Sequence, residues 1–145
     1  MHGGGFIFLL CPRTGRILLG RRSDTAKFSP STWFCFGGTW EEGESLLETA
    51  QREFFEETKI TKDKYNVLPN LVHKIDNYDN DGNLHHIGIF LATCESELFP
   101  EINFENKDWK WFKLSDLPSI NTHDFLMDMF INEKTRSWIK SLLIQ

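Results

Sequence analysis

A cluster of acidic residues within one predicted helix limits most strongly what this chain can fold into. Residues 38–60 read GTWEEGESLLETAQREFFEETKI. Because residues three and four apart share a helix face, Glu53, Glu56 and Glu57 are predicted to project together. Like charges on one stripe destabilise a helix unless a cation neutralises them, and Arg52, four residues before Glu56, can neutralise one. The remaining negative charge indicates a site for a divalent cation bound by oxygen atoms.

The surroundings of this stripe favour a site over the competing interpretation, a solvated acidic face. Ser45 followed three residues later by Glu48 is the pattern of a capping box, so the helix is expected to run from about residue 46 to residue 58. Gly37 and Gly38 are predicted to form a loop before it, in which the backbone can approach a ligand closely. A further carboxylate, Glu44, stands between the glycines and the helix.

The stretch resembles the signature of the Nudix hydrolase family, G-x5-E-x7-R-E-U-x-E-E-x-G-U, in which U is a bulky aliphatic residue. The matching positions are Gly38, Glu44, Arg52, Glu53, Glu56, Glu57 and Ile60. Phe54 departs from it as an aromatic residue, and Lys59 stands where the family uses glycine to end the helix in a left-handed conformation. We expect Lys59 to cost about 1 kcal/mol of stability and to leave the chemistry intact.

The resemblance implies roles for the polar residues of the stretch. Glu53, Glu56 and Glu57 would bind metal, and Glu56 or Glu57 would also take the proton from the attacking water. Arg52 would orient a glutamate and not touch substrate. Glu44 would support the metal shell or the loop.

Two further contributions to the site are expected from outside the helix. A backbone carbonyl of Gly37 or Gly38 would help to hold the metal, as the resemblance implies. A separate general base would come from the loop before the last strand. The candidates are Glu95, Glu97, Glu101 and Glu105. We favour Glu105, because it is the last of them before the predicted strand at Trp109.

Four residues are candidates for substrate binding. Arg21 and Arg22 end a predicted strand, and the planar guanidinium group suits phosphate. Lys27, in the following polar loop, is a third phosphate candidate. Tyr78 precedes a predicted turn and is a candidate for stacking on a nucleobase, because a tyrosine at about this distance is linked to dinucleoside polyphosphates in the family. For all four, an ordinary surface position is the competing interpretation.

The order of predicted elements indicates an α/β (α+β) fold. An opening hairpin spans residues 5–20, and a second hairpin spans residues 67–94 with Asp81-Gly82 at its turn. Residues 109–118 resemble the last strand and turn of Nudix domains. Two helices are expected at about residues 122–144, with Phe125, Met129, Trp138 and Leu142 packing against the sheet or a partner subunit. The resemblance implies the Nudix fold, a mixed β-sheet sandwiched between α-helices.

Length and charge narrow the class of protein. The 145 residues fit one domain, residues 1–145, and the net charge of −5 argues against general nucleic-acid binding. No apolar run approaches a membrane span and no signal-peptide pattern opens the chain. Three widely spaced cysteines indicate reduced core thiols in a cytoplasmic protein. We expect a monomer or homodimer.

The expected reaction is hydrolysis of a phosphoanhydride bond in a nucleoside diphosphate linked to a group X, releasing a nucleoside monophosphate. Mg²⁺ is the expected cofactor, with Mn²⁺ as a substitute. Residues 105–107 resemble the corresponding part of Nudix enzymes acting on (deoxy)nucleoside triphosphates, which makes these the favoured substrates. ADP-ribose, nucleotide sugars, dinucleoside polyphosphates and the capped end of RNA stay open. A non-catalytic nucleotide sensor and a non-hydrolytic enzyme, such as an isoprenoid isomerase, are two hypotheses of a different class.

Overall fold

The computed structural model describes residues 2–26, 29–119, 121–123 and 133–142. Its strands are β1 (His2–Cys11), β2 (Arg16–Arg22), β3 (Trp33–Phe34), β4 (Phe36–Thr39), β5 (Asn66–Tyr78), β6 (Leu84–Thr93) and β7 (Asn106–Lys113). The helices are α1 (Leu46–Thr58) and α3 (Glu133–Ser141), with short 3-10 helices η1 (Lys62–Lys64) and η2 (Leu114–Ser119).

Strand β1 lies at the centre of a mixed sheet. Along one edge it pairs in parallel with β6, and β5 then pairs antiparallel with β6. Along its other edge the first half pairs antiparallel with β4 and the last residues pair with β2. Strand β2 in turn pairs with β3 and β7. The β3–β4 segment therefore lies between β1 and β2 where these two strands diverge, and it carries the chain directly to α1.

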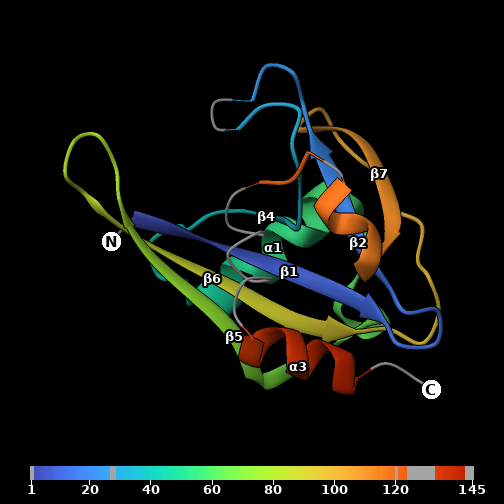
Figure 1. Cartoon of the computed structure of the whole chain (residues 1–145). Coiled ribbons are helices and arrows are strands. Elements are labelled where there is room, and N and C mark those ends of the chain that lie inside the picture. Colours follow the sequence, from blue (N-terminus) through green and yellow to red (C-terminus); the bar gives the residue numbers. More distant parts are fainter. Residues whose placement is uncertain (1, 27–28, 120, 124–132, 143–145) are drawn as a thin grey trace.

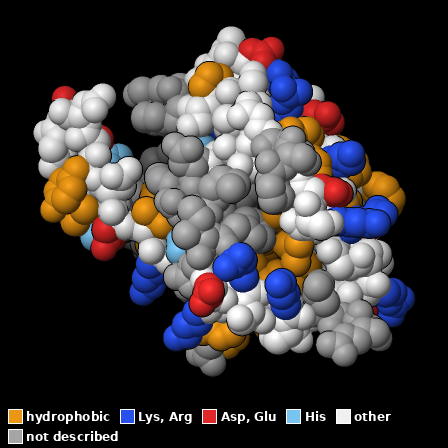
Figure 2. Space-filling model, viewed as in Figure 1, with side chains coloured by type: hydrophobic (Ala, Val, Ile, Leu, Met, Phe, Trp, Pro, Cys, Tyr) orange, Lys and Arg blue, Asp and Glu red, His pale blue; other side chains and the backbone are white. Residues whose placement is uncertain are grey.

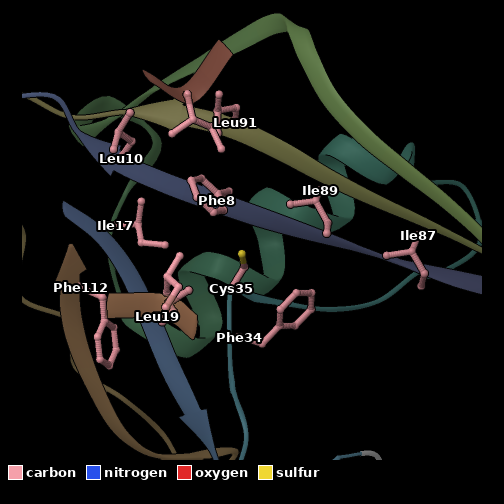
Figure 3. Close-up of a cluster of buried hydrophobic side chains, with 12 residues drawn as sticks. Phe8, Leu10, Ile17, Leu19, Phe34, Cys35, Ile87, Ile89, Leu91 and Phe112 are labelled. Atoms are coloured by element: carbon pink, nitrogen blue, oxygen red, sulfur yellow. The ribbon is translucent and has the colours of Figure 1, made fainter. Parts of the chain in front are cut away.

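Alternation of side chains along β1 divides the core into two layers. Ile7 and Leu9 pack on the α1 face with Ala50 and Phe54 of the helix. Phe8 and Leu10 pack on the opposite face, together with residues of β2, β6 and β7 and with Ile139 of α3 (Figure 3). Figure 1 shows α1 behind the sheet and α3 in front of it. The expected mixed sheet between helices is confirmed.

The two glycines before the helix lie within a strand, and their prediction as a loop is wrong. Gly37 and Gly38 belong to β4, where they pair with Phe6 and Gly5 of β1. A Cβ atom on Gly37 would lie 2.2 Å from the carbonyl oxygen of Gly5. Glycine is required here because the neighbouring strand and the helix approach the backbone too closely for any side chain.

Helix α1 begins and ends as the sequence predicts. The Ser45 hydroxyl accepts a hydrogen bond from the Glu48 N–H, and the Glu48 carboxylate accepts one from the Ser45 N–H, which completes the capping box. Lys59 ends the helix in the left-handed region at φ 62°, and its N–H donates to the carbonyl of Phe55. Phe54 is fully buried, so an aromatic residue at this position serves as core.

Of the two helices expected at about residues 122–144, the structure describes the second, α3. Phe125 and Met129 lie outside the described residues, and so does most of the first of the two expected helices. In α3, Ile139 is buried, and Leu142 just after the helix packs against the same core layer. The three cysteines are buried free thiols, as expected.

Candidate functional site

Three carboxylates from two distant segments meet beside the β4–α1 junction. Ligand oxygens of Glu53, Glu57 and Glu105 all lie within 4.8 Å of one another. Glu53 and Glu57 are one helical turn apart, so both project from α1 toward β4. Glu105 comes from the loop before β7. Its backbone is fixed on both sides, because its carbonyl accepts from the Ser23 N–H at 3.0 Å and its N–H donates to Asn103 Oδ1 at 3.0 Å.

Glu57 is the most buried of the three, with 4% of its surface exposed. Its Oε2 accepts a hydrogen bond from the Gly37 N–H at 2.9 Å, and its Oε1 accepts one from Asn106 Nδ2 at 2.8 Å. The pKa of Glu57 is raised to about 8, mainly by burial and also by the negative charges of Glu105 and Glu53, while the bonds from Asn106 and Gly37 oppose the shift. Without a cation the buried Glu57 therefore favours its protonated form, and a nearby cation would favour the charged form.

Glu53 lies directly against strand β4. A Cβ atom on Gly38 would stand 2.5 Å from the Glu53 carboxyl carbon, so the glycine leaves the space that the carboxylate occupies. The side chain is 13% exposed and accepts a hydrogen bond from Arg52 Nη1 at 2.9 Å. Burial raises the pKa of Glu53, and the bond from Arg52 opposes that shift. Each of the two glycines in β4 thus contacts a glutamate of α1.

Arg52 connects the loop before the helix to the carboxylates. Its Nε and Nη2 donate to the two oxygens of Glu44 at 2.7 and 3.0 Å, and Nη2 also donates to the carbonyl of Thr39. The bond from Arg52 lowers the pKa of Glu44 to about 2, and the bond to Glu44 raises the pKa of Arg52. The fork-to-carboxylate geometry explains why arginine stands here. Arg52 thus links Glu44 to Glu53, and the supporting roles of Arg52 and Glu44 stay a prediction.

Glu56 is placed differently from the other two glutamates of the predicted stripe. Its side chain is 51% exposed, and its carboxylate lies 3.3 Å from Arg52 Nη1. It is not part of the group formed by Glu53, Glu57 and Glu105. Its backbone carbonyl accepts a hydrogen bond from Asn103 Nδ2 at 3.3 Å, which ties the loop of Glu105 to the helix.

The remaining base candidates lie in other contacts. Glu97 is paired with Arg16 at 3.7 Å, and the backbone N–H of Glu101 donates to the Thr58 carbonyl. Glu95 is exposed at the start of the loop. Of the four candidates, the structure brings Glu105 to the helix glutamates.

The backbone groups of Gly37 and Gly38 point in different directions. Gly38 and Gly5 are partners across the sheet, whereas the Gly37 N–H turns away from β1 toward Glu57. In an antiparallel pair the N–H and C=O of one residue point to the same side. The Gly37 carbonyl is therefore the better placed of the two backbone candidates for a metal.

The substrate-binding candidates are spread over the molecule. Arg21 and Arg22 lie within β2 and thus alternate between its faces. Arg21 packs with its guanidinium carbon 5.9 Å from the centre of the Trp33 ring and donates to the Ser31 carbonyl. Arg22 pairs with Asn106 across β2 and β7, so it is the arginine expected on the carboxylate side. Lys27 lies outside the described residues.

Tyr78 ends β5 in the second hairpin and is 69% exposed. This hairpin extends away from the body of the molecule, and its tip forms a separate lobe in the space-filling view (Figure 1 and Figure 2). The structure therefore does not bring Tyr78 to the carboxylates.

Sequence reasoning missed the part played by Asn106. The sequence places this residue in the run 105–107 and assigns no role to its side chain. Its contact with Glu57 joins residues 49 positions apart, across a strand pairing that local patterns do not determine. A polar residue at a strand start, next to a favoured base candidate, is the signal that could have found it.

The donor set fits a hard divalent cation. Carboxylate and carbonyl oxygens are the ligands that Mg²⁺ prefers, and Glu53, Glu57, Glu105 and the Gly37 carbonyl are of this kind. Three carboxylates this close repel one another, so a cation between them would be favoured.

No helix among the described residues is long and apolar enough to cross a lipid bilayer.

Comparisons with known proteins concern the family and the fold of this chain. The model of the NUDIX domain family matches residues 1–132. The mRNA-decapping protein g5R of African swine fever virus is 30% identical over 110 residues, which are 73% of this chain and 45% of that protein. The chain therefore spans less than half the length of the curated relatives that it matches.

Solved structures show the same fold. The Nudix hydrolase RenU of M. smegmatis superposes with a TM-score of 0.82 at 16% identity, over 99% of this chain and 89% of that one. An Ap4A hydrolase of C. elegans gives a TM-score of 0.71 at 20% identity, over 97% and 93%. A MutT protein of Methanosarcina mazei gives 0.73 at 20% identity, over 92% and 91%. With the family match over residues 1–132, the chain belongs to the Nudix hydrolase family.

Proposed function

We propose that this protein hydrolyses a phosphoanhydride bond in a nucleoside diphosphate linked to a group X, with Mg²⁺ as cofactor. The observation that carries the proposal is the meeting of Glu53, Glu57 and Glu105 within 4.8 Å of one another. Water would add to a phosphorus atom while the bridging P–O bond breaks. The products would be a nucleoside monophosphate and X-phosphate, or pyrophosphate when the substrate is a triphosphate.

The carboxylates would serve both cation binding and proton transfer, and Glu105 would take part in both. Glu53, Glu57 and Glu105 would hold the cation, with the Gly37 carbonyl as a further ligand. When bound, the cation neutralises phosphate charge and makes a bound water more acidic. Glu105 lies on the exposed loop and would accept the proton from the attacking water, and Glu56 is the second candidate acceptor, from the solvent side of α1. Arg52 holds Glu53 and Glu44 in place through its hydrogen bonds.

A (deoxy)nucleoside triphosphate is the first substrate candidate. The support is the run 105–107, in which Glu105 belongs to the carboxylate group and Asn106 donates a hydrogen bond to Glu57. Arg22 is the candidate for contact with the outer phosphates, because it projects on the carboxylate side of β2. Manganese would substitute for magnesium, since the ligands are oxygen atoms.

A capped RNA end is the second candidate. It is favoured by the 30% identity to a viral protein named as an mRNA-decapping protein. A cap also contains a nucleoside diphosphate linked to a further group, so the same carboxylates would serve. The net charge of −5 argues against tight binding of a long RNA body, so recognition would rest on the cap itself.

The test is a panel of substrates with Mg²⁺ and chromatographic identification of products. The panel holds nucleoside triphosphates, ADP-ribose, a nucleotide sugar, a dinucleoside polyphosphate and capped RNA. We expect a nucleoside monophosphate, or for capped RNA a methylated guanosine nucleotide, to be released by the wild type and not by Glu57→Gln. Glu42→Gln is the matched control, because Glu42 is an exposed carboxylate outside the group and the charge change is the same. Intact substrates together with bound nucleotide would contradict hydrolysis and favour a sensor.

A further inference from the structure

We propose that Asn106 is a positioning residue that orients the Glu57 carboxylate through a hydrogen bond. The absence of a side chain at Gly20 leaves the space that the Asn106 amide occupies. The inference rests on the proposed metal-dependent function. It concerns how this chain presents a buried carboxylate to a cation. Asn106 is 8% exposed and begins β7, next to Glu105 in sequence.

Two neutral donors from different strands fix the Glu57 carboxylate. Asn106 Nδ2 donates to Oε1 at 2.8 Å from β7, and the Gly37 N–H donates to Oε2 at 2.9 Å from β4. With one donor on each oxygen, the plane of the carboxylate is set by both strands. A carboxylate has about four lone-pair positions, so about two stay available for a cation.

A neutral donor suits this position better than a cationic one. A lysine or arginine at position 106 would neutralise Glu57 and repel a divalent cation. The amide of Asn106 orients the carboxylate and leaves its formal charge in place. Hydrogen-bond partners of this kind fix the orientation of metal ligands in many proteins.

The backbone of Gly20 lies on the side of the Asn106 amide that faces away from Glu57, and a side chain there would not fit. A Cβ atom on Gly20 would lie 2.9 Å from Asn106 Oδ1 and 2.5 Å from Cε1 of Phe36. Any side chain there would therefore push on the buried Phe36 ring as well as on the asparagine. In addition, the pairing of β2 with β7 shifts register between Arg21 and Arg22, and this shift places Asn106 opposite Arg22. The amide thus stands between the backbone of β2 and the Glu57 carboxylate.

A purely structural role is the competing explanation, since buried amides need hydrogen-bond partners for stability alone. Metal affinity separates the two roles, because a structural residue changes stability without changing the cation site of the folded protein. Mn²⁺ is the probe, and free Mn²⁺ is measured by electron paramagnetic resonance in the absence of nucleotide. Folding of every variant is checked by thermal unfolding.

Asn106→Leu removes the donor at similar volume, and we expect its affinity for Mn²⁺ to fall by about 10- to 100-fold. Gly20→Ala keeps both partners and crowds the Asn106 amide together with the Phe36 ring, so it should weaken Mn²⁺ binding in the same direction. Hydrolysis by Asn106→Leu should recover as the Mn²⁺ concentration is raised.

Two controls match the perturbations. Thr58→Val removes an equally buried polar group that bonds to Phe54 and Ile60, and should lower the melting temperature without changing Mn²⁺ affinity. Gly88→Ala adds a methyl group 3.0 Å from the Phe90 ring, away from the carboxylates, and should also leave Mn²⁺ affinity unchanged.

The outcomes are distinct. A folded Asn106→Leu that binds Mn²⁺ as tightly as the wild type overturns the positioning role. If Asn106→Leu does not fold, Asn106→Ala, which removes the same donor without adding a branched apolar side chain, decides in the same way. If the wild type binds Mn²⁺ no better than Glu57→Gln, the proposed metal-dependent function fails, and the inference fails with it.

Discussion

Replacing Glu57 by glutamine tests the electrostatic reasoning directly. In the metal-free folded protein the pKa of Glu57 is about 8, against 4.5 for an ordinary glutamate. Between these values the folded state keeps a proton that the unfolded state has released. The free energy of unfolding must therefore fall as the pH rises through this window. At about 1.4 kcal/mol per pH unit, less near pH 8 where the folded state also begins to lose the proton, the loss due to Glu57 between pH 5 and pH 8 is about 3.5 kcal/mol.

Glu57→Gln should remove this part of the pH dependence. The introduced amide can accept from the Gly37 N–H and donate to the carbonyl oxygen of a rotated Asn106 amide, so the contacts are conserved. The measurement is urea unfolding in the presence of a chelator at pH 5, 6, 7 and 8, followed by tryptophan fluorescence. The difference in stability between variant and wild type should grow by about 3.5 kcal/mol over this range.

Two controls test whether the effect comes from the buried charge of Glu57. Glu42→Gln should follow the wild type at every pH, because Glu42 is exposed. Added Mg²⁺ should stabilise the wild type at pH 8 and leave Glu57→Gln largely unaffected, since only the former keeps the buried carboxylate. Stability curves of Glu57→Gln and wild type that stay parallel from pH 5 to pH 8 would refute the reasoning.

Three further predictions concern α1 and its ends. Lys59→Gly should raise the free energy of unfolding by about 1 kcal/mol in urea, because φ is 62° there and glycine adopts this region without strain; a loss of stability would contradict this. Ser45→Ala should lower it by about 1 kcal/mol through loss of the cap, and an unchanged midpoint would count against the capping role. Arg52→Lys should reduce the rate of hydrolysis by about 10-fold or more, because one ammonium group cannot replace the bonds to Glu44, Thr39 and Glu53 together, and a wild-type rate would show that these bonds are dispensable.

Local features of the sequence determine the parts of the fold and site that can be predicted well. The capping box of Ser45 and the four-residue spacing of Glu53 and Glu57 define α1 and its charged face without reference to the remaining chain. The place of Glu105 before the last strand favours it among the base candidates, and the structure brings it to the helix glutamates. Its role as a base stays a prediction.

The errors and omissions come from contacts between distant segments. Glycine pairs usually mark turns and so predict a loop at Gly37 and Gly38, whereas the close approach of β1 and α1 demands glycine inside a strand. The sequence assigns Asn106 no role because its partner depends on the register of β7 against β2. The position of Tyr78 away from the carboxylates depends on the direction in which a long hairpin leaves the sheet (Figure 1).

The distance along the chain between Glu57 and Asn106 has a consequence for folding. The capped helix contains mostly local contacts and is expected to form early, while β7 reaches its place only after long loops have closed. Until then Glu57 stays hydrated and ionised at neutral pH. We expect Glu57 to lose its hydration in the last step of folding. Removing its charge by Glu57→Gln should therefore slow unfolding more than it accelerates folding.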